Sequence, residues 1–152
     1  VATYMAGKGY LPLAQTNMQG IKAWMRQNPS KLSEVLGQNP SYVFFRTTTG
    51  AADEGPIGAL GAPLTGEYSA AIDKHHVELG APIFVATTHP LNNKPHNRLI
   101  VAQDTGSAIK GGVRVDYYWG YGDAAGEVAG KMKHPGQVWM LLPNGYTPRY
   151  QP

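Results

Sequence analysis

Three aspartates lie inside or at the ends of short apolar runs, where a carboxylate group needs a specific partner. Asp73 follows the run at 69–72, Asp104 follows the run at 99–103, and Asp116 lies within the run at 113–119. Burying an unpaired carboxylate is unfavourable, so each is expected to accept hydrogen bonds, to coordinate a ligand or to stay protonated. Carboxyl groups in such surroundings can transfer protons as general acids or bases.

A structural role is also open for two of the three. Asp73 and Asp104 stand at expected strand ends, where aspartate commonly forms turns. Asp116 has Val115 and Tyr117 as its neighbours within an expected strand, so no turn explains it. Asp116 is therefore the strongest candidate for proton transfer.

The triplet Asp104-Thr105-Gly106 also occurs in aspartic proteases, where two such loops let two carboxylates share one proton. The chain has only one copy, and the preceding residue is the polar Gln103. The sequence disfavours that class of enzyme.

Histidine gives no metal site. His75 and His76 are adjacent, and neighbouring residues on a strand point to opposite faces, so they cannot bind one ion together. His89, His96 and His134 lie in expected loops, where histidine is usually solvated. We therefore expect neither a metal nor a cofactor.

A cluster of aromatic residues follows Asp116: Tyr117, Tyr118, Trp119 and Tyr121. Strand alternation should send about half of these rings into the core. Aromatic faces exposed beside an acid are surfaces on which sugar rings stack, so the combination points to a carbohydrate ligand.

The patterning predicts a mainly β chain with a short helical start. Helices are expected at 16–27, with Thr16 and Gln19 as a capping box, and at 30–36, capped by Ser30. A third helix should begin near Asp123 and end before His134. Short β-prone runs alternate with Gly and Pro, as in a small closed or partly closed barrel, at residues 42–47, 68–72, 82–87, 98–103, 113–119 and 138–142.

Composition narrows the classes of protein further. The 152 residues carry a formal charge of +3 with no concentrated basic run, so a DNA-binding use of the first two helices is disfavoured. The absence of cysteine excludes thiolate nucleophiles, and no Gly-x-Ser-x-Gly elbow occurs. No segment approaches the roughly 20 apolar residues of a membrane-spanning helix. The start at Val1 lacks a signal-peptide pattern and suggests a mature product or a piece of a longer protein.

Several segments together resemble one family. They read NPSYVFFR, SAAID followed by LGAPIF, RLIVAQDTGSAIKG, VDYYWGYGDAAGEVAGKMK and VWMLLP. In this order they are similar to the C-terminal half of the membrane-bound lytic murein transglycosylase A family (MltA), including its three-aspartate "3D" domain. The resemblance implies a helical segment at 1–45 belonging to a second, groove-forming domain, a double-psi β-barrel at 46–143, and a tail at 144–152.

The resemblance also implies an activity. Such an enzyme cuts the β-1,4 bond between N-acetylmuramic acid and N-acetylglucosamine in peptidoglycan without water and leaves a 1,6-anhydromuramoyl end. It implies a periplasmic protein, held at the outer membrane by a lipid anchor in a preceding portion. Asp116 matches the family's acid/base, and Asp104 and Asp73 match its two other motif aspartates. Substrate contacts are expected from Lys110, Tyr117, Tyr118 and Trp119, and the chain departs from the pattern at Ser107, where a second glycine is expected.

One carboxyl group can serve both steps of this reaction. Asp116 would protonate the leaving glycosidic oxygen and then accept the proton of the muramoyl C6 hydroxyl as that hydroxyl attacks C1. We expect apolar neighbours such as Val115, and the like charge of Asp104, to keep Asp116 protonated. In the family the preceding portion completes the barrel and the groove, so the chain alone should be weakly active or inactive. Two alternatives stay open: a hydrolytic endoglycosidase on a similar barrel, and a glycan-binding module without catalysis.

Overall fold

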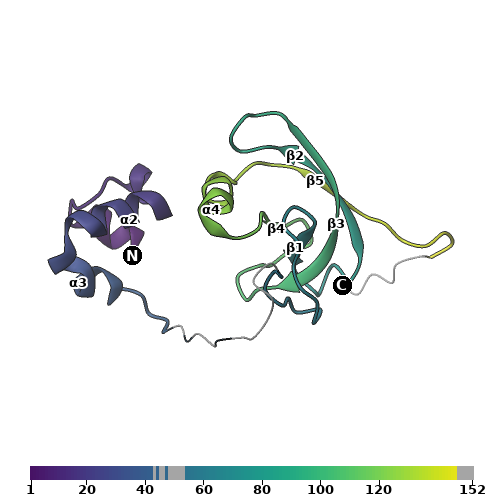
Figure 1. Cartoon of the computed structure of the whole chain (residues 1–152), viewed down its shortest axis with the longest axis horizontal. Helices are drawn as coiled ribbons and strands as arrows, with labels where there is room; N and C mark the ends of the chain where they lie inside the picture. Colours follow the sequence, from purple (N-terminus) through teal and green to yellow (C-terminus); the bar gives the residue numbers. More distant parts are fainter. Residues whose placement is uncertain (43, 45–46, 48–53, 147–152) are drawn as a thin grey trace. The chain divides into compact units, whose positions relative to one another are not determined.

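The computed structural model describes residues 1–42, 44, 47 and 54–146, and it contains two compact units (Figure 1). The first is Val1–Thr49 and the second is Gly50–Pro152. Among the described residues, no helix is both long and apolar enough to cross a bilayer.

The first unit is helical. It contains α1 (Ala2–Gly7), α2 (Met18–Gln27) and α3 (Leu32–Leu36), with 3₁₀ turns at Leu13–Gln15 and Pro29–Lys31. Met5 of α1 and Val35 of α3 are fully buried. They supply the apolar contacts that hold these short helices, which would not be stable in isolation.

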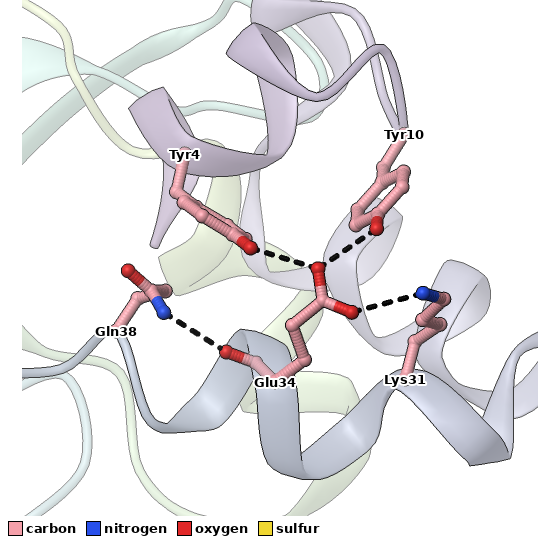
Figure 2. A network of polar contacts seen from close by, with 5 residues as sticks. All are labelled: Tyr4, Tyr10, Lys31, Glu34 and Gln38. Atoms are coloured by element: carbon pink, nitrogen blue, oxygen red, sulfur yellow. Dashed lines mark hydrogen bonds and ion pairs between the residues drawn. The ribbon is translucent and has the colours of Figure 1, made fainter.

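A carboxylate ties the helical unit together (Figure 2). Glu34 Oε1 accepts hydrogen bonds from the hydroxyls of Tyr4 at 2.7 Å and Tyr10 at 2.8 Å. Glu34 Oε2 pairs with Lys31 Nζ at 3.0 Å, and the Glu34 carbonyl accepts from Gln38 Nε2 at 3.2 Å. The hydrogen bond from Tyr4 comes first among the causes that lower the pKa of Glu34 to about 2, followed by those from Lys31 and Tyr10.

The second unit is built on a five-stranded sheet. Its strands are β1 (Ser69–Ile72), β2 (Pro82–Thr88), β3 (Pro95–Thr105), β4 (Val115–Tyr118) and β5 (Gln137–Met140), in the order β4-β1-β3-β2-β5. β1 and β3 are parallel, and the other neighbouring pairs are antiparallel. α4 (Gly122–Lys131) connects β4 to β5. The described part of this unit is therefore a mixed, mainly β arrangement, as the sequence predicts.

One face of the sheet forms the core. Alternate residues along the strands are buried, and the most deeply buried are Ala70, Ile72, Ile83, Ile100 and Ala102. Their β-branched or small side chains pack at the spacing that a pleated strand imposes. Val115 and Tyr117 of β4 pack against this core, so Asp116 and Tyr118 project from the opposite face.

Several predicted boundaries are wrong in detail. Asn17, and not Thr16, caps α2: its side chain accepts from Gly20 N at 2.8 Å, while the Thr16 hydroxyl donates to Leu13 O. α3 begins at Leu32, because a 3₁₀ turn occupies the preceding residues, and α4 begins at Gly122.

Other differences concern whole elements. The sequence pattern did not predict α1. His75 and His76 lie in a turn after β1 and not on a strand. The predicted strand at 42–47 lies largely outside the described residues, as does the tail from residue 147 onward.

Candidate functional site

Two of the three predicted aspartates lie on either side of one alanine. Ala71 of β1 is in register with Asp104 on β3 and with Asp116 on β4. Residues in register across a sheet point to the same face, and two strand spacings separate Cα atoms by roughly 10 Å. A register shift between Ala70 and Ala71 brings Asp104, rather than its neighbour, opposite Ala71. The topology thus places Asp104 and Asp116 on the face turned away from the core.

Asp116 is exposed and carries an ion pair. Arg114 Nε lies 2.8 Å from Asp116 Oδ1, and Arg114 Nη2 lies 3.0 Å from Asp116 Oδ2. Arg114 Nη1 also donates to Ala108 O at 2.6 Å. The hydrogen bond to Asp116 is the main cause that raises the pKa of Arg114.

The expectation of a buried Asp116 is wrong for this structure. Its side chain is 44% exposed because β4 is an edge strand and Asp116 points away from the core. Val115 packs inward and does not shield it.

Asp104 lies at the end of β3 and is partly buried. Its Oδ1 accepts a hydrogen bond from Ala59 N at 3.0 Å. The residue therefore holds a loop from before β1 against the sheet, and it also faces the same side as Asp116.

Asp73 is buried and satisfied by backbone groups. Its Oδ1 accepts from His75 N at 3.1 Å, and its Oδ2 accepts from Gly111 N at 2.9 Å. The bond from Gly111, followed by that from His75, lowers the pKa of Asp73. Asp73 thus anchors the loop at 106–114, which carries the exposed Lys110 and ends at Arg114, the partner of Asp116.

A groove of about 480 Å³ runs along the free edge of β4. One wall comes from β4 and the residues that follow it, and the other comes from the end of α4. It is lined by Arg114, Val115, Asp116, Tyr117, Trp119, Ala129, Met132, Lys133 and His134. The groove combines a carboxylate, cations and aromatic rings, which are the groups that bind and cleave polar, ring-shaped ligands.

Two histidines join the aromatic cluster, which the sequence did not predict. His96 lies 5.2 Å from Tyr117 and 5.0 Å from Trp119 between ring centroids, and His89 lies 5.3 Å from Trp119. His96 Nε2 is 3.1 Å from the Tyr117 hydroxyl, which donates to Glu67 O. The rings therefore fix one another, and Tyr117 and Trp119 of this cluster line the same groove as Asp116.

The expectation that His96 is a solvated loop residue is wrong. His96 is on β3 and only 8% exposed, because β3 extends back to Pro95 through polar residues that conceal the strand in the sequence. Burial, and then the cation of Arg98, lower the pKa of His96. Burial, and then the charge of Glu67, raise the pKa of Tyr117 to about 12. Both side chains are thus neutral near pH 7.

Tyr118 and Trp119, the two other aromatic residues predicted to contact the substrate, have different surroundings. Tyr118 faces the same side as Asp116, while Trp119 lines the groove. The Tyr118 hydroxyl, Trp119 Nε1 and His134 Nδ1 are buried without a hydrogen-bond partner in the part of the chain that the structure describes. That same part contains no group of three or more His, Asp or Glu side chains suited to a metal ion.

Comparison with known proteins gives the family. The model of the 3D domain matches residues 68–142, and the model of the MltA specific insert domain matches residues 1–46. The chain belongs to the membrane-bound lytic murein transglycosylase A (MltA) family. The 3D-domain match includes β1 to β5 and all three aspartates, and the insert-domain match covers the helical unit.

Relatives match almost the whole of this chain. The crystal structure of MltA from Neisseria gonorrhoeae in its monoclinic form is 68% identical with a TM-score of 0.88, and the match covers 99% of this chain and 38% of that one. The structure of Escherichia coli MltA with bound chitohexaose is 31% identical with a TM-score of 0.78, over 91% of this chain and 42% of that one. The curated E. coli K12 protein is 34% identical over 148 residues, which are 93% of this chain and 39% of the relative. The chain thus spans about two fifths of the length of these relatives.

Proposed function

We propose that this chain is the catalytic portion of a peptidoglycan lytic transglycosylase. The enzyme would cleave the bond between N-acetylmuramic acid and N-acetylglucosamine without water and would leave 1,6-anhydromuramoyl ends. The single observation that carries this proposal is the placement of Asp104 and Asp116 on one face, with Asp116 opening into an aromatic-lined groove. The relatives' names support the same reaction class.

In this proposal Asp116 is the acid/base. It protonates the glycosidic oxygen as the C1–O bond breaks, and it then accepts the proton of the muramoyl C6 hydroxyl as that oxygen bonds to C1. The nucleophile belongs to the substrate, so the chain needs no second reacting carboxylate. Tyr117 and Trp119 would hold the sugar against Asp116, since positioning contributes much of the rate of such reactions.

The ion pair adds a condition to the first step. Arg114 donates to both oxygens of Asp116, so it competes with the glycosidic oxygen of the substrate for this carboxyl group. The side chains of Arg114 and Asp116 are 48% and 44% exposed, and an exposed pair of this kind is weak. Substrate entering the groove would displace the guanidinium from Asp116.

Asp73 would support this site indirectly in the same proposal. It holds the loop at 106–114 through Gly111. Within that loop, Arg114 Nη1 donates to the Ala108 carbonyl. Lys110 on the loop would approach anionic parts of the substrate.

The finer description of the fold belongs to the same proposal. We place the sheet unit in a double-psi β-barrel at 46–143, with the helical residues 1–45 in a groove-forming domain and a tail at 144–152. A further portion, corresponding to the rest of the relatives' length, would complete the barrel and the groove. The whole protein would act in the periplasm at the outer membrane through a lipid anchor, with peptidoglycan glycan strands as its partner and no nucleic acid.

A hydrolytic endoglycosidase is the second candidate. Asp104 and Asp116 face one side of the sheet, and inverting enzymes use two carboxyl groups on opposite sides of the scissile bond to activate water. Asp104, however, already accepts a hydrogen bond from Ala59 N. A binding module without catalysis is the third, and it needs the rings but not the carboxylates.

Product mass separates these candidates. Purified chain is incubated with peptidoglycan sacculi, beside a chimera in which it replaces the matching 38% of the N. gonorrhoeae protein. We expect the chimera to release muropeptides one water lighter than hydrolysis products, and the chain alone to release few or none. Products of hydrolytic mass would establish the second candidate, and no products from a folded, glycan-binding chimera would establish the third.

A further inference from the structure

A buried histidine contacts the aromatic wall of the groove along β4. His96, near the start of β3, is 8% exposed and is not among the residues that line the groove. Its ring centroid lies 5.2 Å from that of Tyr117 and 5.0 Å from that of Trp119, which do line it. The ring centroids of Tyr117 and Trp119 are themselves 4.6 Å apart. His96 therefore supports both rings without facing a ligand in the groove.

This contact links two strands whose backbones are not paired. In the described sheet β1 lies between β4 and β3, and β4 pairs with β1. The rings of His96 and Tyr117 connect β3 to β4 directly. Their contact therefore fixes the rings of β4 relative to β3, in addition to the backbone pairing through β1.

The hydrogen bonds of the Tyr117 hydroxyl determine what His96 has to donate. The hydroxyl donates to the Glu67 carbonyl at 2.5 Å and lies 3.1 Å from His96 Nε2. A hydroxyl has one hydrogen to donate, so Nε2 is the donor in the second pair. The neutral ring with its hydrogen on Nε2 meets this requirement and places no charge in a buried site.

Several titratable groups surround His96. Arg98 follows it on β3, Glu67 lies before β1, His89 follows β2 with its ring centroid 5.8 Å away, and Tyr117 lies on β4. Burial, and then the cation of Arg98, lower the pKa of His96, while Glu67 opposes this effect and His89 adds to it. Glu67 is already paired with Arg98 at 3.1 Å. A proton on His96 would therefore place a second cation beside Arg98 in a buried site, which is unfavourable unless the ring moves.

We propose that His96 is a positioning residue for the transglycosylase reaction, whose neutral ring holds Tyr117 and Trp119 where they place the substrate against Asp116. This inference rests on the proposed function, since it concerns how the same groove is held. Protonation of His96 drives its ring out of the buried site, so Tyr117 loses a hydrogen bond and Trp119 loses a ring contact. Turnover then decreases as the pH falls below the ordinary histidine pKa of 6.5, by a route separate from the titration of Asp116 itself.

The first test is an NMR titration of the full 152-residue chain from about pH 7.5 to about pH 4.5. The indole N–H of Trp119 reports on the groove wall. Those of Trp24 and Trp139 are internal references, because their ring contacts lie outside the histidine cluster. His96→Gln keeps an N–H for the Tyr117 hydroxyl but cannot titrate in this range.

His89→Gln is the matched control, because the His89 ring also contacts Trp119 but has no hydrogen bond to Tyr117 among the described contacts. The Trp119 indole signal should shift in step with the His96 ring protons in the wild type and in His89→Gln, and it should stay constant in His96→Gln. A Trp119 signal that ignores the His96 titration, or one that stops shifting only in His89→Gln, would overturn the proposal. The wild-type titration decides this even where a variant does not fold.

The second test measures kcat/KM of the chimera for soluble glycan strands. The ratio of kcat/KM at about pH 7 to that at about pH 5 should be roughly 3- to 10-fold larger for the wild type than for His96→Gln, because the titration of Asp116 is common to both. His75→Gln, at an exposed histidine in the turn after β1, should keep the wild-type ratio.

The outcomes separate this inference from the function on which it rests. Equal ratios for the wild type and His96→Gln, with anhydromuropeptides still released, would overturn the positioning role and leave the proposed function standing. Absence of anhydromuropeptides at every pH would remove the proposed function and this inference together.

Discussion

Each compact unit contains a carboxylate paired with a cation nearby in sequence, and the two carboxylates differ in every other contact. Glu34 in the helical unit accepts from Tyr4 and Tyr10 as well as from Lys31. Asp116 in the sheet unit accepts only from Arg114, among the contacts that the described residues make. Asp116 also lines the groove along β4.

In our proposal this difference separates a structural carboxylate from a reactive one. Glu34 joins α3 to Tyr4 on α1 and to Tyr10 in the segment that follows α1. We therefore expect the fold of the helical unit to depend on the Glu34 carboxylate. Asp73 belongs to the same kind, because backbone N–H groups from two loops bind its oxygens. The partner of Asp116 is Arg114, only two residues away. We therefore expect that breaking this ion pair disturbs little of the structure. Sequence spacing alone does not distinguish these cases.

The largest effect on stability should come from Glu34→Ala. The variant leaves two tyrosine hydroxyls and Lys31 without their common acceptor, and it should lower the melting temperature of the helical unit by roughly 5 °C or more. Hydrogen exchange measured by mass spectrometry should speed up in α1 and α3 and stay unchanged in the strands. Glu127→Ala is the control, since Glu127 makes only an exposed i,i+4 pair with Lys131. Equal effects of the two variants would contradict the structural role of Glu34.

The helical unit should also depend on pH through Glu34. Its pKa in the folded chain is about 2, below the ordinary value of 4.5, so its contribution is fully present above pH 4.5. That contribution is lost as the pH falls from about 4.5 toward 2. Hydrogen exchange of α1 and α3 should accelerate over this range after correction for the intrinsic rates, and Glu34→Gln should remove most of this dependence. A wild-type chain with no such dependence would refute the assignment.

Asp73→Asn should have the next effect, a loss of several degrees in the melting temperature. The amide can accept only through its oxygen, so one of the N–H groups of His75 and Gly111 loses its acceptor in the buried site. Exchange should accelerate in residues 106–114 first. Asp123→Asn provides the control, because Asp123 is exposed on α4. A fully stable Asp73→Asn variant would place Asp73 with Asp116 as a reactive group.

Arg114→Gln should change stability least, by about 2 °C or less, because exposed ion pairs contribute little. Turnover by the chimera at pH 7 should rise a few-fold, since Asp116 no longer has to be released from the guanidinium. Lys74→Gln, at an exposed lysine after β1, controls for the loss of one positive charge. A loss of turnover greater than about tenfold would instead mean that Arg114 positions Asp116.

The sequence predicted the strands of the sheet unit well because their apolar alternation is local. The runs around Ile72, Ile83 and Ile100 appear as strands close to their predicted positions. The polar start of β3 carries no such signal, and His96 was therefore misplaced in a loop. α1 is too short to show a helical period, and its tertiary contact through Met5 is what stabilises it.

The contacts of the candidate site could not be predicted from the sequence. The aspartates and the aromatic run stood out from their apolar neighbours. The exposure of Asp116 follows from the position of β4 at the edge of the described sheet, and Asp73 accepts a hydrogen bond from Gly111 N on a loop far from it in sequence. Both depend on contacts between distant segments. The same holds for the ring contacts of His96, which join β3 to β4.

Asp116→Asn, compared with Asp104→Asn in the chimera, tests the central claim most directly. Release of anhydromuropeptides from sacculi is followed by mass spectrometry, with chitohexaose binding and melting temperature measured on the same samples. We predict that Asp116→Asn lowers turnover by roughly 1,000-fold or more while binding and melting temperature stay unchanged, and that Asp104→Asn retains more activity. Undiminished turnover by Asp116→Asn, with loss in Asp104→Asn, would contradict the account and move the acid/base role to Asp104.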